Sequence, residues 1–214
     1  MIKFYGRATA FNVIKVGWFL TELGLEFEHI QVGGRFGGLD TAEYGKLNPT
    51  RKIPTVVDNG QAIWESHTIL RYLAEVYGSD QFYPADPFER SLQNRWMDWS
   101  LSVFQPAFIG LFWGYYRTPP SKRDMDFVNA RLEQCEFHLN ALDGQLAKTR
   151  FLAGDNFSIG DIPAGAVLYR LTEIGISVEL PASVDRWYAE LKQRAGYQEW
   201  VMGDFSELEA REDF

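Results

Sequence analysis

Residues 48–73 read NPTRKIPTVVDNGQAIWESHTILRYL, and this stretch predicts two short strands followed by a helix. Pro54 stands at the start of a β-forming run, where a missing N–H is tolerated. Asn59 and Gly60 both accept positive φ, so they predict a tight type I′ turn between antiparallel strands. Apolar residues at helical spacing follow from Ser66 onward. The stretch is therefore a β-hairpin leading into a helix.

The start of this helix has the chemistry of a small binding site. The hydroxyl of Ser66 and the backbone N–H groups at a helix N-terminus can bind a carboxylate. Glu65, directly before it, can receive an ammonium group. Side by side, the two suit the α-amino, α-carboxylate end of an amino-acid-like ligand.

The residues before the hairpin complete a small domain. Residues 2–5 are a short strand, residues 12–23 have the apolar spacing of a helix closed by a glycine, and residues 27–32 alternate as a second strand. A strand, helix and strand in this order predict a right-handed crossover with parallel strands. With a short, irregular helix at residues 41–47 and the hairpin, they indicate a thioredoxin-like domain over residues 1–78.

Beyond a proline-containing linker at residues 79–88, the chain is predicted to be helical to residue 214. The expected helices cover residues 89–117 (interrupted at Pro106), 123–148, 159–174, 181–194 and 196–202, and the acidic tail from residue 204 is expected to be loosely held. The fold class is thus an α/β domain followed by an all-α domain.

Composition narrows the classes of function. The net charge of −8 argues against a nucleic-acid partner. No run approaches the ~18 apolar residues of a membrane span, and the N-terminus lacks the apolar region of a signal peptide. A single cysteine, Cys135, excludes an internal disulfide and fits a reducing compartment. His29 and His138 lack the spacing of metal ligands. We expect a cytoplasmic protein without a metal site.

Taken in order, Pro54, the Asn-Gly turn and the pair Glu65-Ser66 resemble the glutathione-binding half of the cytosolic glutathione transferases. The resemblance extends over essentially the whole chain, because a thioredoxin-like domain, a linker and a helical bundle follow in the family's order. Residues 151–170, FLAGDNFSIGDIPAGAVLYR, resemble the family's helix-capping signature. Residues 5–13 lie where a group of bacterial transferases has a loop similar to GRANSSNV. The resemblance implies the glutathione transferase fold and glutathione as co-substrate.

The resemblance assigns glutathione-binding roles to five residues. In the family, a cis proline exposes the backbone of the preceding residue to the cysteinyl part of glutathione, which implies this role for Ile53 and Pro54. Glu65 and Ser66 would hold the γ-glutamyl end. Lys52 would bind the glycyl carboxylate, or it is simply a solvated surface lysine.

Thiol activation is where the chain departs from the family. The family places a tyrosine, serine or cysteine in the loop after the first strand, but the position aligned with the serine is Ala10 here. Asn12 is the first candidate donor to the sulfur, Thr9 the second and Tyr5 the third, and backbone N–H groups of the first turn can contribute. Alternatively, Asn12 is simply the N-cap of the first helix.

In the second domain, the family's hydrophobic substrate site lies near an aromatic cluster at the end of the first long helix. The members of this cluster are Phe108, Phe112, Trp113, Tyr116 and Arg117. An aromatic stripe at helical spacing is also typical of a buried core. His67, which follows Glu65-Ser66, is expected on the helix surface or on a dimer-facing side.

The sequence therefore favours a homodimeric glutathione transferase that conjugates the glutathione thiolate to an apolar electrophile. Two alternatives stay open. One is a glutathione-dependent disulfide reductase or peroxidase of the same fold. The other is a non-catalytic glutathione-binding protein, because Ala10 has no side-chain donor.

Overall fold

The computed structural model describes residues 1–210, which fold as two compact units. Unit 1 comprises Met1–Pro84 and Arg194–Gly203. Unit 2 comprises Ala85–Gln193 and the residues from Asp204 onward. The change from the first unit to the second, after Pro84, falls within the expected linker.

Unit 1 contains a mixed β-sheet. Its strands are β1 (Ile2–Tyr5), β2 (Phe27–Ile30), β3 (Thr55–Asp58) and β4 (Gln61–Trp64), in the order β2-β1-β3-β4. β1 pairs with β2 in parallel and with β3 antiparallel, so Phe4 lies between His29 and Val56. Asn59 (φ 48°) and Gly60 (φ 79°) join β3 to β4. The predicted parallel strands and hairpin are confirmed, and this is the thioredoxin-like arrangement.

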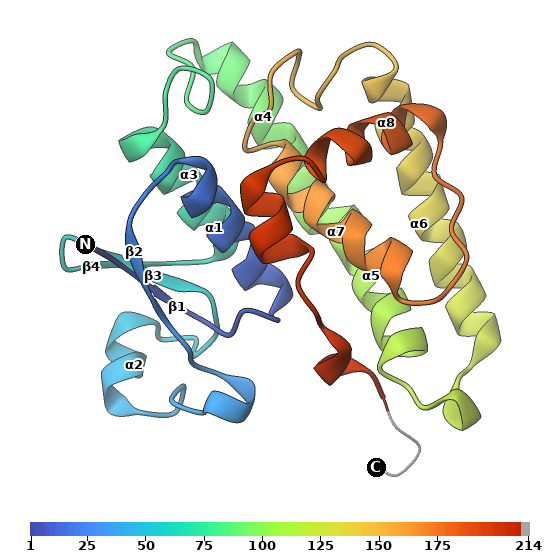
Figure 1. Ribbon diagram of the computed structural model, residues 1–214, viewed down its shortest axis with the longest axis horizontal. Coiled ribbons are helices and arrows are strands. Elements are labelled where there is room, and N and C mark those ends of the chain that lie inside the picture. Colours follow the sequence, from blue (N-terminus) through green and yellow to red (C-terminus); the bar gives the residue numbers. More distant parts are fainter. Residues whose placement is uncertain (211–214) are drawn as a thin grey trace. The chain divides into compact units, whose positions relative to one another are not determined.

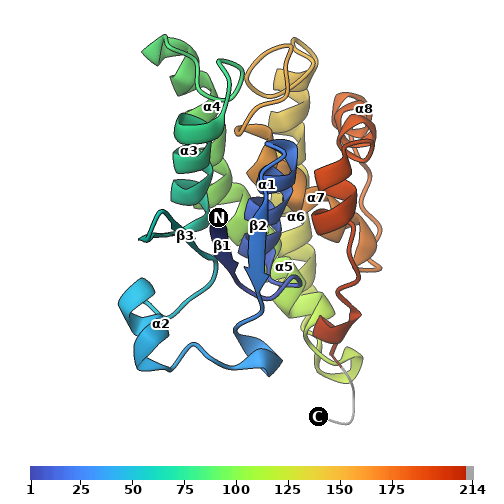
Figure 2. The same cartoon turned by 60° about the vertical axis from the view of Figure 1, so that its left-hand side comes forward.

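Three helices accompany the sheet: α1 (Phe11–Glu22), α2 (Ala42–Leu47) and α3 (Ser66–Tyr77). α1 packs against α3, and α3 packs against the strands of the hairpin, whereas α2 lies apart from this pair (Figures 1 and 2). α1 is buried almost all round from residue 13 to residue 20. The starts of α1 and α3 are thereby brought together.

A segment from the end of the chain also belongs to unit 1. Arg194–Gly203 contains the π-helical turn η5 (Tyr197–Val201), which packs on α1. A Cβ added to Gly17 would overlap the ring of Trp200, so only glycine makes room for it. The guanidinium of Arg194 donates to both carboxylate oxygens of Glu22, at 2.9 and 2.6 Å. The turn near residues 196–202, which the sequence predicts as a helix, therefore packs within unit 1 through contacts between residues far apart in the chain.

Unit 2 is helical, as predicted. Its helices are α4 (Pro87–Trp99), α5 (Gln105–Leu111), α6 (Met125–Leu146), α7 (Asp161–Glu173) and α8 (Ala182–Leu191), with π-helical turns η2 (Ser100–Phe104) and η3 (Phe112–Tyr116) on either side of α5. Pro106 is the second residue of α5. Its missing N–H cannot continue a regular α-helix, and the wide turn η2 directly precedes it.

The start of α7 is fixed by a buried carboxylate. Asp161 accepts hydrogen bonds from the backbone N–H of Leu152 (2.9 Å), from the N–H and hydroxyl of Ser158 (2.9 and 3.1 Å) and from Trp187 Nε1 (3.1 Å). Burial raises the pKa of Asp161 to about 6, against the opposing effect of these bonds. The contacts agree with the helix-capping signature that residues 151–170 resemble, in which Ser158 and Asp161 have a structural role.

The acidic tail is not loosely held as far as residue 210. The side chains of Phe205 and Leu208 are buried, and Phe205 packs on Tyr116 with 5.3 Å between ring centroids. The N–H of Ala210 donates to the carbonyl of Tyr116 at 3.0 Å. The burial of these apolar side chains holds this part of the tail in place despite its negative charge. Residues 211–214 lie outside the described residues.

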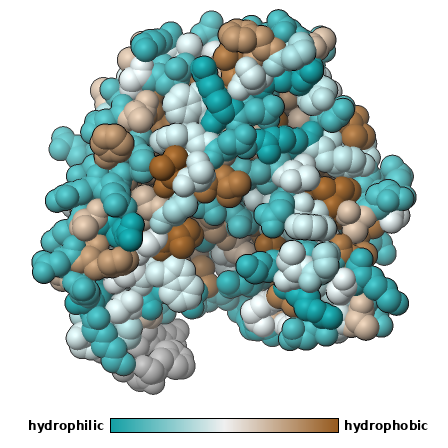
Figure 3. Space-filling view, turned by 180° about the vertical axis from the view of Figure 1, so that it is seen from behind, coloured by the Kyte–Doolittle hydropathy of each residue, from teal (hydrophilic) through white to brown (hydrophobic). Residues whose placement is uncertain are grey.

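The surface carries apolar side chains from several elements. The most exposed large ones include Phe88 on α4, Trp113 on η3 and Phe137 on α6. On the face shown in Figure 3, hydrophobic patches alternate with hydrophilic side chains. No helix within residues 1–210 combines the length and the hydrophobicity needed to cross a bilayer.

Candidate functional site

The loop between β1 and α1 ends at Ala10, which is the N-cap of the helix and makes no side-chain capping bond. The first helical hydrogen bonds run from the N–H groups of Val13 (2.9 Å) and Ile14 (3.1 Å) to the carbonyl of Ala10. The amides of Phe11 and Asn12 precede these bonds and belong to the positive end of the helix dipole. Ala10 therefore caps α1 through its backbone carbonyl and has no side-chain donor.

Asn12 is the second residue of α1. The alternative that it is the N-cap is therefore wrong, because the cap lies two residues earlier. Its side chain is partly exposed, and Oδ1 accepts a hydrogen bond from Lys15 Nζ at 3.0 Å. The carbonyl end of the amide is thus turned toward the interior.

The other two candidate donors differ in their surroundings. Thr9 is partly exposed, and its Oγ1 accepts a hydrogen bond from Arg7 at 3.2 Å. Tyr5 packs edge-on against Tyr44, with 6.1 Å between ring centroids. Tyr5 is therefore engaged with α2 through its ring, which keeps it third among the candidates.

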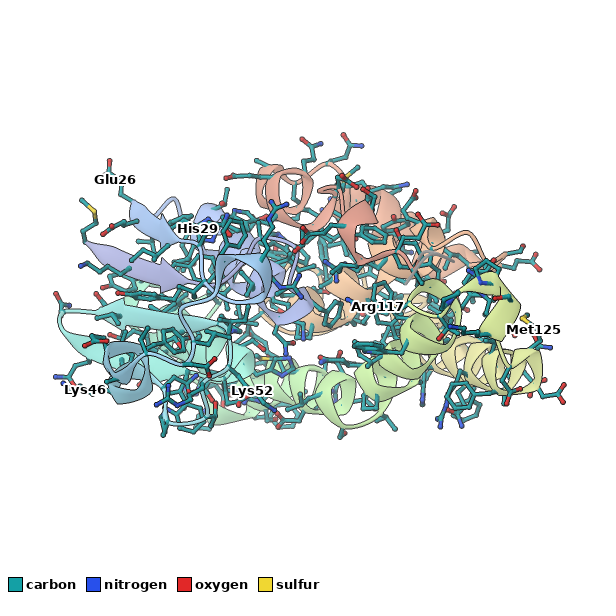
Figure 4. The ribbon with its side chains drawn as sticks, turned by 90° about the horizontal axis from the view of Figure 1, so that it is seen from below. Glu26, His29, Lys46, Lys52, Arg117 and Met125 are labelled. Carbon is teal, nitrogen blue, oxygen red and sulfur yellow. The ribbon has the colours of Figure 1, made fainter. Side chains whose placement is uncertain are left out.

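The backbone before β3 is firmly anchored. The carbonyl of Lys52 accepts hydrogen bonds from Tyr44 Oη (2.7 Å) and from Nδ2 of the buried Asn48 (2.9 Å). The Ile53–Pro54 peptide bond is cis, as the resemblance implied. The side chain of Lys52 is exposed, and Figure 4 marks it at the surface of unit 1. A free lysine head beside an anchored backbone suits a ligand carboxylate.

Glu65 and Ser66 lie where β4 passes into α3. Glu65 has φ 67° and ψ 118°, is exposed and makes no capping bond, whereas Ser66 is only 4% exposed. A residue with a Cβ in this conformation costs about 1–3 kcal/mol, and such strain clusters at ligand sites. An exposed carboxylate beside a buried hydroxyl and the N-terminus of a 12-residue helix can hold an ammonium and a carboxylate together.

A buried pair behind these residues was missed by the sequence analysis. Lys15 is fully buried, and its Nζ lies 3.0 Å from Asn12 Oδ1 and 3.4 Å from His67 Nε2. Burial lowers the pKa of Lys15 to about 7. Burial, followed by the charges of Lys15 and Arg71, lowers the pKa of His67 to about 2. His67 is 4% exposed, so its expected place on the helix surface is wrong. α1 covers this position.

One sequence signal could have found Lys15. Residues 13–20 read VIKVGWFL, and Lys15 is the only charge in this apolar run. A helix that is apolar on all sides is expected to be covered on all sides, which buries a charge within it. No comparable signal marks His67, whose burial depends on where α1 packs.

The five aromatic-cluster residues divide into two groups. Phe108, Phe112 and Tyr116 are buried and pack with one another, which is core packing in unit 2. Trp113 is 55% exposed, and the guanidinium of Arg117 lies 4.6 Å from its ring centroid. Figure 4 labels Arg117 on this unit. Trp113 and Arg117 are the two members that present an amphipathic surface.

Two other kinds of site can be checked against the described residues: a nucleophilic cysteine and a metal site. Burial raises the pKa of Cys135 to about 12, so its thiol stays protonated and is a poor nucleophile. His29 Nε2 donates to the carbonyl of Gly6 at 2.7 Å. Within the described part of the chain, no three His, Cys, Asp or Glu side chains are grouped so that they could hold a metal ion.

Known proteins match this chain over nearly its whole length. The sequence matches the families "Glutathione S-transferase, N-terminal domain" over residues 12–76 and "Glutathione S-transferase, C-terminal domain" over residues 104–204. It is 34% identical over 204 residues to glutathione S-transferase GstB of Escherichia coli (strain K12), covering 94% of this chain and 98% of the relative. Glutathione S-transferase D6 of Drosophila melanogaster is 32% identical over 169 residues, 78% of this chain and 75% of the relative.

Among solved structures, a theta class glutathione S-transferase from the citrus canker pathogen Xanthomonas axonopodis pv. citri matches with a TM-score of 0.89. Its sequence identity is 41%, the match covers 95% of this chain and 98% of that chain, and that structure contains bound glutathione.

Proposed function

The chain belongs to the glutathione S-transferase family, and we propose that it binds glutathione at the starts of α1 and α3 and conjugates the glutathione thiolate to an apolar electrophile. In this reaction the thiol loses its proton to solvent. The thiolate sulfur then forms a bond to an electrophilic carbon, and a leaving group departs with its bonding electrons. The protein contributes by binding and orienting the thiol and by stabilising its thiolate form.

Glu65 and Ser66 bind the γ-glutamyl end in this proposal. The exposed Glu65 carboxylate receives the ammonium, and the Ser66 hydroxyl and the first amides of α3 receive the carboxylate. The macrodipole of α3 favours an anion at this end. The surroundings of Glu65 support the assignment, because its carboxylate is exposed and makes no capping bond to α3.

The remaining parts of glutathione extend along the segment before β3. The backbone of Ile53, preceding Pro54, pairs with the cysteinyl part. Lys52 receives the glycyl carboxylate. The two hydrogen bonds to the Lys52 carbonyl keep this backbone in place whether or not a ligand is bound.

The sulfur lies at the start of α1, where Asn12 donates to the thiolate from Nδ2 and Thr9 is the second donor. Donation to the charged form and the positive end of the helix dipole both lower the pKa of a thiol. A side-chain amide thus takes the place of the hydroxyl that Ala10 lacks.

One observation carries this assignment. Lys15 contacts both Asn12 and His67, and His67 directly follows Ser66. The thiol-activating and γ-glutamyl-binding ends of the candidate site are therefore neighbours within unit 1, although they lie more than fifty residues apart in the sequence.

The second substrate is assigned by chemical class only, as an apolar electrophile. We place the apolar electrophile against the exposed ring of Trp113, with Arg117 beside it. A homodimer in the cytoplasm is part of the proposal and rests on the family.

Calorimetric titration with glutathione, combined with the ultraviolet absorbance of the bound thiolate across pH, tests this function. We expect binding and a thiol pKa below that of free glutathione. Turnover is then followed with glutathione and an activated aryl chloride. Absence of glutathione binding would sink the site, and binding with an unshifted thiol pKa would favour a non-catalytic binding protein.

Two variants separate binding from activation. Glu65→Gln should weaken glutathione binding about tenfold or more through the lost charge pairing, and leave the pKa of the bound thiol unchanged. Asn12→Ala should raise the pKa of the bound thiol with little change in affinity. Glu75→Gln, an exposed glutamate on the same helix, is the matched control and should behave as wild type. If Glu65→Gln and Glu75→Gln bind glutathione equally well, Glu65 has no role in binding.

A further inference from the structure

The buried side chain of Lys15 joins the two helix starts described above, and we propose that it is a positioning residue that turns the amide NH₂ of Asn12 toward the sulfur of glutathione. This inference rests on the proposed function, because it needs a sulfur at the start of α1. Lys15 is fully buried, so it acts through Asn12 and not by touching the ligand.

The direction of the Asn12 amide follows from the chemistry of lysine. An ammonium group has three donors and no acceptor. Only the amide oxygen can therefore face Lys15 Nζ at 3.0 Å. The Nδ2 group lies at the other corner of the planar amide, directed away from Lys15. A thiolate needs a donor, so this orientation is the productive one, whereas the flipped amide would present a carbonyl to the sulfur.

Lys15 is itself held in position by two aromatic groups. Its Nζ lies 4.6 Å from the ring centroid of Phe11 and 3.4 Å from His67 Nε2. Because the ammonium cannot accept, Nε2 of His67 is the acceptor and the ring proton is on Nδ1. In the described structure, Nδ1 is buried and has no hydrogen-bond partner.

The tautomer of His67 carries a free-energy cost, and this cost indicates that the tautomer has a role. A buried donor without a partner costs about 1–3 kcal/mol. That cost is incurred at a position next to Ser66, where the imidazole presents a lone pair to Lys15. His67 on α3 thus holds the ammonium of Lys15, and the ammonium in turn holds the amide of Asn12 on α1.

The charge of Lys15 adds to this orientation. An ammonium behind the amide favours an anion in front of it, and the attraction is strong where water is excluded. The same attraction keeps Lys15 protonated when the thiolate forms. Lys15 and Asn12 together offset the missing hydroxyl at Ala10.

The test compares Lys15→Met with wild type and with Lys148→Met, an exposed lysine in unit 2 that serves as the matched control. The readouts are the pKa of the bound glutathione thiol, KM for glutathione and kcat with an activated aryl chloride. We expect Lys15→Met to reduce the thiolate fraction and kcat about tenfold at a pH near that pKa, with KM within about twofold. Lys148→Met should match wild type.

Two further variants distinguish positioning from a purely structural role. Asn12→Asp keeps an acceptor for Lys15 but has no donor for sulfur, so it should lose the thiol pKa shift as Asn12→Ala does. Adding Lys15→Met to Asn12→Ala should cause a smaller loss than Lys15→Met causes in wild type, because only the effect of the charge is left to remove. A folded Lys15→Met protein with an unchanged thiol pKa would overturn the inference, as would an Asn12→Asp protein with wild-type thiolate. If the thiol of glutathione bound to wild type shows no lowered pKa, the proposed function itself is refuted, and the inference that rests on it is refuted as well.

Discussion

Replacing Lys15 with methionine removes a charge whose cost to the fold can be worked out. Burial lowers the pKa of Lys15 from 10.5 to about 7. Below pH 7, the folded and unfolded chains both hold the proton, and the folded chain carries the full cost of a buried ammonium. Between pH 7 and 10.5, only the unfolded chain holds it. The stability of wild type should therefore rise with pH across this window.

The magnitude follows from the same shift. A pKa difference of this size corresponds to roughly 4–5 kcal/mol in total, of which about 2 kcal/mol is recovered between pH 7 and pH 9. Methionine fills a similar volume without a charge, so Lys15→Met should be about 1–4 kcal/mol more stable than wild type at pH 7. This gain should shrink by about 2 kcal/mol at pH 9.

Urea unfolding followed by tryptophan fluorescence at several pH values measures the difference between the two proteins. The difference between the unfolding free energies of the two proteins cancels the contributions of groups that titrate in both proteins, such as Cys135. The neighbouring His67 stays neutral throughout this range, so it does not change the comparison. A difference in stability that is the same at pH 7 and pH 9 would refute the reasoning, because Lys15 would then titrate alike in the folded and unfolded chains.

The other predictions concern the packing around the site and the second unit. Because the pKa of His67 is lowered, wild type should lose about 2 kcal/mol of unfolding free energy from pH 7 to pH 5. Urea unfolding of His67→Phe at the two pH values should not show this loss. Gly17→Ala forces a Cβ into the Trp200 ring and should cost about 1–3 kcal/mol in thermal unfolding. Gly144→Ala, on an open helix surface, should gain about 0.5–1 kcal/mol, and equal effects of the two would contradict the packing on α1. Asp161→Ala leaves buried donors unpaired and should cost about 3–5 kcal/mol by calorimetry, so a variant as stable as wild type would show that those bonds do not hold α7.

Local patterns were sufficient to predict most of the helices and strands of unit 1. Asn59 and Gly60 predict a turn because both accept positive φ, and the structure has them there. The apolar spacing after Ser66 predicts a helix, and α3 begins at that residue. Hydrophobic periodicity and turn-forming residues involve only a few neighbouring positions, so they can be recognised without knowing what packs against them.

The failures have a shared cause. The expected surface position of His67 is wrong, and the packing of Arg194–Gly203 was not predicted, because both depend on contacts with α1. Burial of this kind depends on pairs that are 52 and more than 170 residues apart. No window of local sequence contains both partners.

By itself, the sequence determined the order of the elements, the two-part division and the pair Glu65-Ser66, because each depends on neighbouring residues. Only the tertiary structure decided that Asn12 is not the cap of α1 and that Lys15 is buried behind it, with His67 as its second contact. The physical reason is that the apolar run around Lys15 indicates burial but does not indicate which residues cover the lysine. The helix packed over it determines the cost of its charge and the direction of the groups it binds.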